Sequence, residues 1–171
     1  KIKEGSFQAG QKHGLWMSFN EKGRKFEEAQ WKNGELSGKT TMWDNSGRKS
    51  IIKSFKEDEK DGLWVWWSPS GNKVKEGSYK LGQKHGKWTF YYADGSKKRL
   101  ENYDKDKKSG QLIRWYANGQ KSQEEFYKND ERHGKFKYWF DNGRLEKEEK
   151  FSNGVQTDGK PVSYTHLRAH E

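Results

Sequence analysis

The stretch GQKHGLWMSFNEKGRK, residues 10–25, recurs downstream as GQKHGKWTFYYADGSK, residues 82–97. The offset is 72 residues, or three periods of 24. Glycines mark this period at two positions, comprising Gly14, Gly38, Gly62, Gly86, Gly110 and Gly134 at the first and Gly23, Gly47, Gly71, Gly95, Gly119 and Gly143 at the second. A period held over six copies and the start of a seventh is typical of a repeat architecture.

Aromatic residues keep the same period at two further positions. The first comprises Phe7, Trp31, Phe55, Tyr79, Tyr103, Tyr127 and Phe151, and the second comprises Phe19, Trp43, Trp67, Tyr91, Trp115 and Trp139. We expect the second set and both sets of glycines to be structural residues of the repeat. A function therefore has to be argued for the array rather than for one residue.

Each repeat reads as two aromatic-rich runs around a short polar break, which is NEKG, DNSG, SPSG, YADG, YANG and FDNG in successive copies. Each break fits a type I turn whose fourth residue is a glycine with positive φ. Asn20, Asp44 and Ser68 offer a short polar side chain at the first turn position. The second break, KNGELSG at residues 32–38, predicts a looser loop.

Dense glycines and short β-forming intervals exclude helix. The sequence therefore predicts an all-β fold, an elongated single-layer antiparallel β-hairpin array of 24-residue repeats. Pairing Phe19 with Lys25 defines the two faces of the sheet, unless a bulge inverts them. One face would carry Leu15, Met17, Phe19, Glu27, Ala29 and Trp31. The other would carry Trp16, Ser18, Phe26 and Glu28. Such a sheet has no thick core, and cross-strand pairs worth roughly 0.2–1 kcal/mol each would stabilise it.

Composition sets further limits. Charged residues make up 35% and apolar residues 29% of the 171 residues, a balance that by itself favours disorder. The nine tryptophans and the strict period favour an ordered sheet instead. The chain has no cysteine, which excludes disulfides and thiolate metal sites, and no apolar run of membrane-spanning length. Since residue 1 is lysine, we expect the native N-terminus to lie upstream, and both a cytoplasmic and an exported location stay open.

The chain divides into two parts. Residues 1–161 form the repeat array, with six full repeats and a partial seventh. Residues 162–171, VSYTHLRAHE, break the period and match the translation of a transposase adapter used in DNA library preparation. We expect this segment to be adapter read-through and the native chain to continue differently after residue 161, so it carries no functional interpretation.

The repeat resembles the bacterial variant of the MORN repeat over about residues 1–161. The resemblance lies in a G.W..YY.DG core and a following K.E..Y.NG stretch, carried here by Gly86, Trp88, Tyr91, Tyr92, Asp94 and Gly95 and by Lys25, Glu28, Trp31, Asn33 and Gly34. Proteins of this variant include the YwqK-like antitoxins of toxin–antitoxin pairs, and MORN arrays serve as protein–protein scaffolds, some with affinity for acidic phospholipids. The resemblance implies an array that binds a partner, and it implies no reaction. Asp58, Asp106 and Leu112 depart from the pattern and predict irregular repeats.

Histidines and glutamates recur at the repeat period. His13, His85 and His133 share one position, but repeats lie roughly 10 Å apart, so they cannot meet at one ion and are predicted to be polar loop residues. The glutamates Glu4, Glu28, Glu76, Glu124 and Glu148 are expected to form cross-strand ladders with lysines rather than acid–base pairs. With no catalytic triad order, phosphate loop or zinc spacing, we expect no catalytic residue, cofactor, metal or small-molecule substrate, and hence no enzyme.

Two basic rows provide the candidate binding surface. Lys25, Lys49, Lys73, Lys97 and Lys121 follow the tight turns, and Lys12, Lys60, Lys84, Lys108 and Arg132 precede the other glycines. Such rows bind the phosphates of nucleic acid or anionic lipid, or else keep the sheet soluble and unpaired at its edges. Trp16, Trp64 and Trp88 complete the candidate site. The aromatic columns either hold the strands together or line a groove for a peptide or sugar.

These patterns predict a non-enzymatic protein–protein interaction module, either an adaptor or the antitoxin partner of a toxin. Two alternatives stay open, which are binding of acidic phospholipid or nucleic acid through the lysine rows and binding of cell-wall glycan. Salt separates them, since polyanion binding weakens steeply with salt and desolvated protein interfaces do not.

Overall fold

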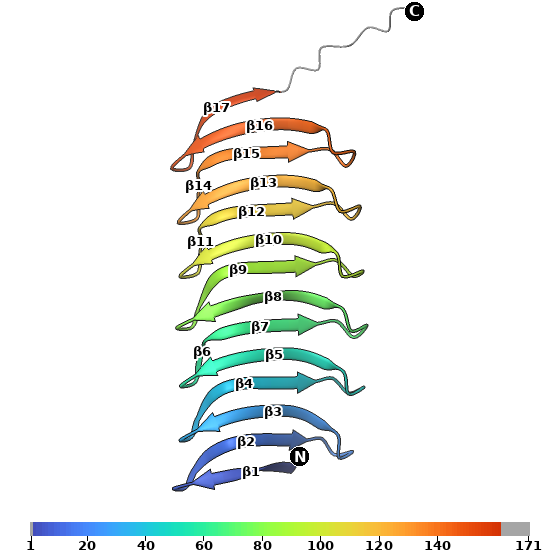
Figure 1. The fold of residues 1–171 in the computed structure, drawn as a ribbon, viewed down its shortest axis with the longest axis vertical. Helices are drawn as coiled ribbons and strands as arrows, with labels where there is room; N and C mark the ends of the chain where they lie inside the picture. Colours follow the sequence, from blue (N-terminus) through green and yellow to red (C-terminus); the bar gives the residue numbers. More distant parts are fainter. Residues whose placement is uncertain (1, 162–171) are drawn as a thin grey trace, which may run out of the picture.

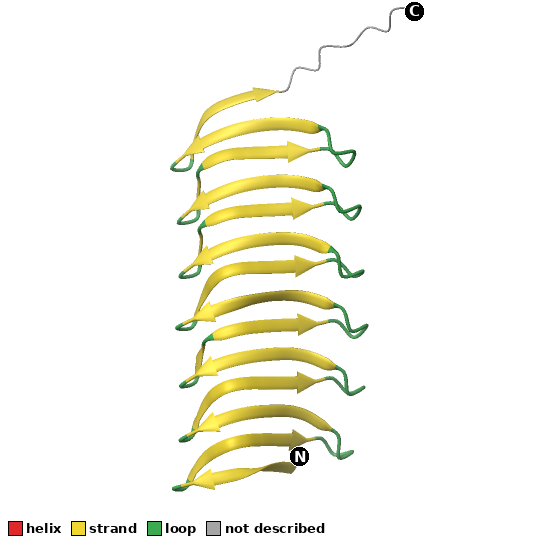
Figure 2. Ribbon diagram, viewed as in Figure 1, coloured by secondary structure: helices red, strands yellow, loops and turns green. Residues whose placement is uncertain are grey.

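The computed structural model describes residues 2–161, which form one 17-stranded sheet with no helix (Figures 1 and 2). None of the described residues therefore lies in a helix that could cross a membrane. The strands are β1 (Ile2–Gln8), β2 (Gln11–Phe19), β3 (Lys25–Lys32), β4 (Glu35–Trp43), β5 (Lys49–Lys56), β6 (Glu59–Lys60), β7 (Gly62–Trp67), β8 (Lys73–Lys80), β9 (Gln83–Tyr91), β10 (Lys97–Asp104), β11 (Lys107–Lys108), β12 (Gly110–Trp115), β13 (Lys121–Lys128), β14 (Glu131–Arg132), β15 (Gly134–Trp139), β16 (Leu145–Ser152) and β17 (Val155–Pro161).

The sheet is an antiparallel meander in which neighbours in sequence are neighbours in space. β1 pairs with β2, β2 with β3 and β3 with β4, and the same order continues to the pair of β16 with β17. Where a strand is interrupted, both of its segments pair with the strand before it, as β6 and β7 pair with β5. Figure 1 shows the hairpins stacked along one axis, with the turns of each kind gathered at one side. The predicted single-layer array of hairpins is confirmed.

The tight turns have the predicted form. In the first, Gly23 has φ +70° and its N–H donates to the Asn20 carbonyl at 3.0 Å, as in a type I turn. The Asn20 side chain accepts hydrogen bonds from the N–H groups of Lys22 and Arg24, each at 3.0 Å. The position that the sequence singled out as a short polar residue thus closes the turn onto its own backbone.

The second break is tighter than predicted. Lys32 pairs directly with Glu35, and the two residues between them, Asn33 and Gly34, have φ +51° and +86°. Two successive left-handed residues make a type I′ turn, which matches the twist of the flanking strands. The predicted looser loop is therefore wrong, because residues 35–38 belong to β4 rather than to a connection.

An aspartate at the second turn position binds the preceding repeat. Asp106 has φ +65°, donates its N–H to the Lys84 carbonyl at 3.1 Å, and accepts the Lys84 N–H on Oδ1 at 2.9 Å. Asp58 and Asp130 bind Leu36 and Lys108 in the same way. The long strand that follows each aspartate is interrupted, as β6/β7, β11/β12 and β14/β15. The irregularity predicted at Asp58 and Asp106 is confirmed, and it extends to Asp130.

A bulge next to each tight turn decides the two faces. Phe19 pairs with Lys25 as predicted, but Ser18 pairs with Glu27, so the register shifts by one residue at Phe26. Trp16 then lies opposite Ala29. Since directly opposite residues share a face, the predicted grouping of Leu15 and Met17 with Ala29 is wrong. The extra residue inverts every position beyond it.

We call the two sides the ring face and the lysine face. The ring face carries Trp16, Trp64, Trp88, Leu112 and Phe136 at one repeat position and the series from Phe7 to Phe151 at the other. The lysine face carries Lys25, Lys49, Lys73, Lys97 and Lys121 with the series from Phe19 to Trp139.

The apolar core is a row of side chains along the ring face. Trp88, Leu112 and Phe136 are at most 2% exposed. The Trp88 ring meets the Tyr79 ring edge-on, with centroids 5.1 Å apart. Gly77, in β8, makes room for this ring, because a Cβ atom at that position would lie 2.1 Å from Trp88 Cδ2. Packing between β8 and β9 therefore depends on matching a large ring with the absence of a side chain.

Candidate functional site

Ion pairs neutralise three of the five candidate lysines on the lysine face. Lys25, Lys73 and Lys121 place Nζ 2.7–2.8 Å from the carboxylates of Glu28, Glu76 and Glu124, three residues further along the same strand. The bulge brings positions three apart onto one face, so these pairs lie within a strand and not across strands as predicted. Glu4 has no ion pair within residues 2–161.

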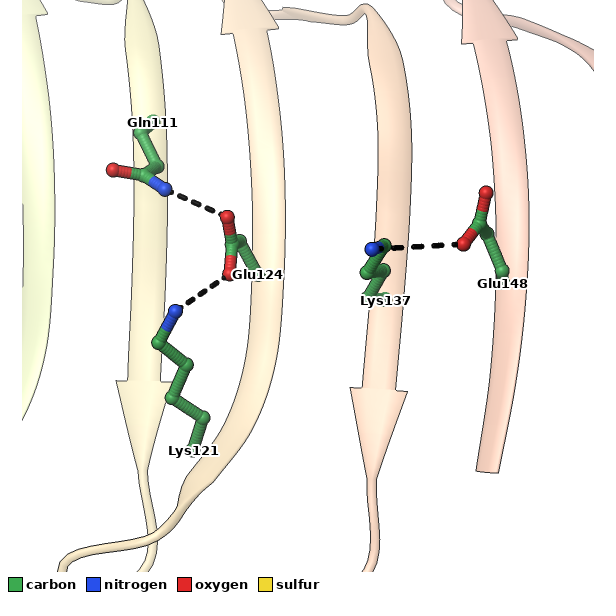
Figure 3. Close-up of polar contacts among 5 residues, drawn as sticks. All are labelled: Gln111, Lys121, Glu124, Lys137 and Glu148. Carbon is green, nitrogen blue, oxygen red and sulfur yellow. Dashed lines mark hydrogen bonds and ion pairs between the residues drawn. The ribbon is translucent and has the colours of Figure 1, made fainter. Parts of the chain in front are cut away.

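Figure 3 shows this arrangement in the C-terminal repeats. Glu124 accepts hydrogen bonds from Lys121 and Gln111, each at 2.8 Å, and these bonds hold the pKa of Glu124 below its ordinary value. In the next repeat Glu148 lies opposite Lys137, with 3.8 Å between Oε2 and Nζ. The predicted cross-strand ladder is confirmed at Glu148.

Lys49 and Lys97 differ from the other three lysines. Ile52 and Leu100 stand where those repeats have glutamate, so within residues 2–161 these two ammonium groups have no carboxylate partner. They are two repeats apart, which corresponds to four strand spacings or roughly 19 Å. The two unpaired ammonium groups of this row are therefore isolated from each other.

A tyrosine and a glutamate are coupled on the same face. The Tyr91 hydroxyl donates to the Glu76 carboxylate. Burial, the hydrogen bond to Glu76 and its negative charge together raise the pKa of Tyr91 to about 12. Burial alone would raise the pKa of Glu76, but the hydrogen bonds from Lys73 and Tyr91 hold it below its ordinary value. These contacts fix the side chains in a solvated network.

The tryptophans of the candidate site belong to the ring face and are part of its packing. Trp64 and Trp88 are 7% and 2% exposed, so their rings present little surface to a ligand. Trp16 lies at the edge-on contact with Phe7, with centroids 5.0 Å apart. The indole N–H groups of all three donate to backbone carbonyls of the preceding strand, at 3.0–3.1 Å. This arrangement makes them structural side chains.

The second basic row covers these rings. Lys84 Nζ lies 4.9 Å from the Trp88 ring centroid and 4.7 Å from that of Tyr103. Arg132 lies similarly over Phe136 and Phe151, at 5.4 and 5.0 Å. Stacked cations of this kind stabilise the rings and hide their faces.

Buried carboxylates continue the ring face in the later repeats. Glu101 and Glu125 are 4% and 6% exposed, and they accept hydrogen bonds from the hydroxyls of Tyr103 and Tyr127 at 2.8 and 2.9 Å. Burial and these bonds raise the pKa of both tyrosines. Each glutamate is thus satisfied by a tyrosine hydroxyl, Glu101 also lies 3.3 Å from Arg99 Nε, and the role of both is structural.

The histidines do not come together. His13 and His85 lie in β2 and β9, so the predicted loop position is wrong for both, and only His133 lies between strands. His85 Nδ1 is 3.3 Å from Asp104 Oδ1. Within residues 2–161, no three His, Asp or Glu side chains lie close enough to hold a metal ion.

A groove on the ring face was not predicted from the sequence. It has a volume of about 470 Å³ and lies at the tight-turn end of β8 to β13, where aromatic and basic side chains meet. Its lining includes Phe90, Tyr92, Lys98, Arg99, Arg114 and Tyr116, together with Tyr91 and Trp115 of the series on the lysine face. The signal in the sequence was two arginines, at positions where the other repeats carry no arginine.

The tyrosines at the rim of this groove are fixed in place. The hydroxyls of Tyr92 and Tyr116 donate to the carbonyls of Trp115 and Trp139, one repeat further on, at 2.6 and 2.7 Å. The Arg99 guanidinium lies 4.1 Å from the Phe90 ring centroid, and Lys98 Nζ lies 5.4 Å from that of Tyr92. The groove is therefore preformed, which lowers the entropic cost of binding.

No curated protein matches the chain. Among solved structures, one chain in a crystal structure of a GtfA/B complex bound to UDP and GlcNAc is 16% identical, with a TM-score of 0.28. That match covers 75% of the present chain and 24% of the other.

The family comparison is more direct. The model of the MORN repeat variant matches four successive segments, residues 60–81, 84–105, 108–129 and 132–153, which together make up just over half of the chain. Each matched segment starts within two residues after a type I′ turn and contains one complete tight turn. The chain therefore belongs to the family of proteins built from the MORN repeat variant.

Proposed function

We propose that this chain is a non-enzymatic binding module that holds a protein partner at the ring-face groove. MORN repeats generally serve as protein- or membrane-binding modules. The observation that carries the proposal is the groove around Arg99 and Arg114, where guanidinium groups adjoin fixed aromatic rings. Arginine, tyrosine and tryptophan are the residue types that dominate the energetic centres of protein interfaces.

The two alternatives have less support. Binding of acidic phospholipid or nucleic acid through the lysine face needs a continuous basic row, and three of its five lysines are already paired with glutamate. Binding of glycan through tryptophan needs exposed rings, and Trp64 and Trp88 are buried. The groove contains basic and apolar side chains together. Binding there requires neither a continuous basic row nor exposed tryptophan rings.

The resemblance to YwqK-like antitoxins makes a toxin the first partner class to test. An antitoxin has to bind one protein tightly, and a preformed groove on a rigid sheet suits that task. Co-expression of the chain with candidate bacterial toxins should restore growth if this part of the proposal holds. Growth that stays arrested with every candidate removes the antitoxin role and leaves the adaptor role in place.

A pull-down tests the proposed function itself. The full chain is immobilised and exposed to bacterial lysate, then washed at roughly 0.15 M salt and at roughly 1 M salt, where electrostatic screening shortens to about 3 Å. We expect one protein to remain in stoichiometric amount through both washes. Recovery of only nucleic acid or lipid, released by the second wash, would reject protein binding and favour the lysine rows.

A further inference from the structure

Two arginines face each other across neighbouring strands of the groove. Arg99 in β10 and Arg114 in β12 are direct register partners. Like charges placed opposite each other destabilise a sheet. The corresponding pairs in the other repeats are Glu27 with Met42, Ile51 with Trp66, Lys75 with Phe90, and Gln123 with Tyr138. The repeat fold therefore does not require the arginine pair, and the destabilisation that this pair causes needs another explanation.

Arg114 has no partner within the described residues. Its Nε atom is buried and has no hydrogen bond, and no ion pair or ring contact involves its guanidinium. The Arg99 Nε atom is also buried without a hydrogen bond, but Arg99 differs because this atom lies 3.3 Å from Glu101 Oε1 in an ion pair and its guanidinium stacks on Phe90. A half-buried guanidinium without a partner is costly unless an anion completes it.

The surroundings define the chemistry of that anion. Lys98 adds a third positive charge to the groove, and Glu101 is the carboxylate that contacts the cluster through Arg99. Phe90, Tyr92 and Tyr116 supply ring surface next to the charges, and Val74, which is 43% exposed, extends the apolar part toward β8. A ligand that fits must therefore carry a planar oxyanion beside an apolar group.

We propose that Arg114, with Arg99 and Lys98, binds a carboxylate of an acidic peptide segment whose neighbouring aromatic or aliphatic side chain lies on the rings of Phe90, Tyr92 and Tyr116. The proposal rests on the proposed function, since the segment belongs to the protein partner. The lining runs from β8 to β13, a span of four strand spacings or roughly 19 Å, which an extended peptide of about six residues covers. A carboxylate satisfies the guanidinium fork with two parallel hydrogen bonds.

Fluorescence anisotropy with a labelled peptide tests this site. The probe is Gly-Asp-Phe-Glu-Leu-Asp-Gly, and the control peptide replaces each acid by its amide. We expect the acidic peptide to bind the full chain and the amide peptide to bind at least about tenfold more weakly, the loss of one charge-assisted hydrogen bond. Arg114→Gln should weaken the acidic peptide by about tenfold or more, whereas Lys49→Gln, which removes an unpaired charge from the lysine face, should change it by less than about twofold.

A second measurement separates a ligand site from a structural role. Because Arg114 faces Arg99, Arg114→Gln should leave the midpoint of thermal unfolding unchanged or raise it. A lower midpoint would assign Arg114 to the packing of the sheet and overturn the proposal. Equal binding of the acidic and amide peptides, or of the Arg114→Gln variant, would overturn it as well.

Two further probes distinguish other sources of an oxyanion. Inorganic phosphate or vesicles containing phosphatidylserine that bind in place of the peptide, with the same loss in Arg114→Gln, would assign the groove to phosphate and reject the peptide. The proposed function is judged separately by the pull-down. A partner that is retained equally by Arg114→Gln would keep the protein-binding function and reject this groove as its site.

Discussion

Gly77→Ala is the substitution that tests the packing of the ring face most sharply. Gly77 lies in β8 opposite Trp64 of β7 and beside Trp88 of β9. Its φ is not in the left-handed region, so alanine is compatible with the backbone there, and in an open strand this change would stabilise the protein by about 0.4–1 kcal/mol through the unfolded chain. Here Gly77→Ala should instead destabilise the protein, because the added Cβ atom would clash with the Trp88 ring.

The magnitude follows from the geometry. A Cβ atom at Gly77 would lie 2.1, 2.4 and 2.5 Å from Trp88 Cδ2, Cε2 and Cγ, well inside ordinary contact. The ring has little room to withdraw, because it is 2% exposed, packs edge-on against Tyr79 and donates from Nε1 to the Ser78 carbonyl at 3.1 Å. Forcing one carbon into a packed core costs about 1–3 kcal/mol.

Thermal unfolding followed by near-ultraviolet circular dichroism measures this cost. For a chain of this size we expect the midpoint to fall by about 3–10 °C. The control is the same change in a Trp88→Leu background. One repeat later, Leu112 stands at the position of Trp88 and Glu101, which has a side chain, stands at the position of Gly77. There the cost of Gly77→Ala should fall by about 1 kcal/mol or more. A Gly77→Ala midpoint at or above that of the parent would refute the assignment of Trp88 to the ring face.

Three further predictions concern the turns, the titrating tyrosines and the ion pairs. Asp106→Ala should lower the free energy of unfolding by about 1–2 kcal/mol in denaturant titrations, because it removes the hydrogen bond from the Lys84 N–H and leaves a non-glycine residue at φ +65°. Asp106→Gly should recover most of this loss. Equal losses for the alanine and glycine variants would contradict the reasoning. Burial and neighbouring glutamates raise the pKa values of Tyr91 and Tyr138 from 10.0 to about 12, so the folded state holds these protons more tightly than the unfolded state does. The free energy of unfolding should therefore fall as pH rises from about 10 through 12. An ultraviolet titration in which every tyrosine ionises near pH 10 would disprove this. Lys121→Ala should cost no more than about 0.5 kcal/mol by thermal unfolding, and a difference that persists at roughly 1 M salt would show that the pair with Glu124 is not a surface ion pair.

The period and the tight turns explain why much of the fold was predictable. Glycine at the fourth turn position and a short polar residue at the first leave few alternatives to a type I turn, and Gly23 and Asn20 behave accordingly. Twenty-four residues per repeat then leave room for one hairpin and its connection. Local turn chemistry, repeated in register, was sufficient to predict the sheet.

The faces were not predictable in the same way. A bulge of one residue, at Phe26 in the second repeat, shifts the pairing beyond it and exchanges the two sides of the strand. The residue type at that position does not predict the bulge, since Phe26 is replaced by Ser50, Val74 and Lys98 in the next copies. The type I′ turn at Asn33 and Gly34 was predictable, since Asn-Gly is the strongest short signal for it. The connection was predicted to be too long because Gly38, which has φ +115°, lies within β4 and does not end a loop.

The candidate site depended on those faces. Trp88 was expected to belong to the candidate binding site, and the structure makes its ring part of the core. Arg99 and Arg114 lie 15 positions apart in sequence. The interruption between β11 and β12 shifts the register beyond the Tyr103–Lys108 pair and places the two arginines opposite each other. Charge patterns that depend on register are visible only after the register is known.

Carbodiimide cross-linking of the captured complex is the measurement that tests the central claim most directly. The reagent joins carboxylates to lysines in contact, and Lys98 lies in the groove whereas Lys25, Lys49, Lys73, Lys97 and Lys121 lie on the lysine face. We predict that acidic residues of the partner are joined to Lys98 and that Arg114→Gln abolishes this cross-link. Cross-links confined to Lys49 and Lys97, unchanged by Arg114→Gln, would contradict the account and move the binding surface to the lysine face.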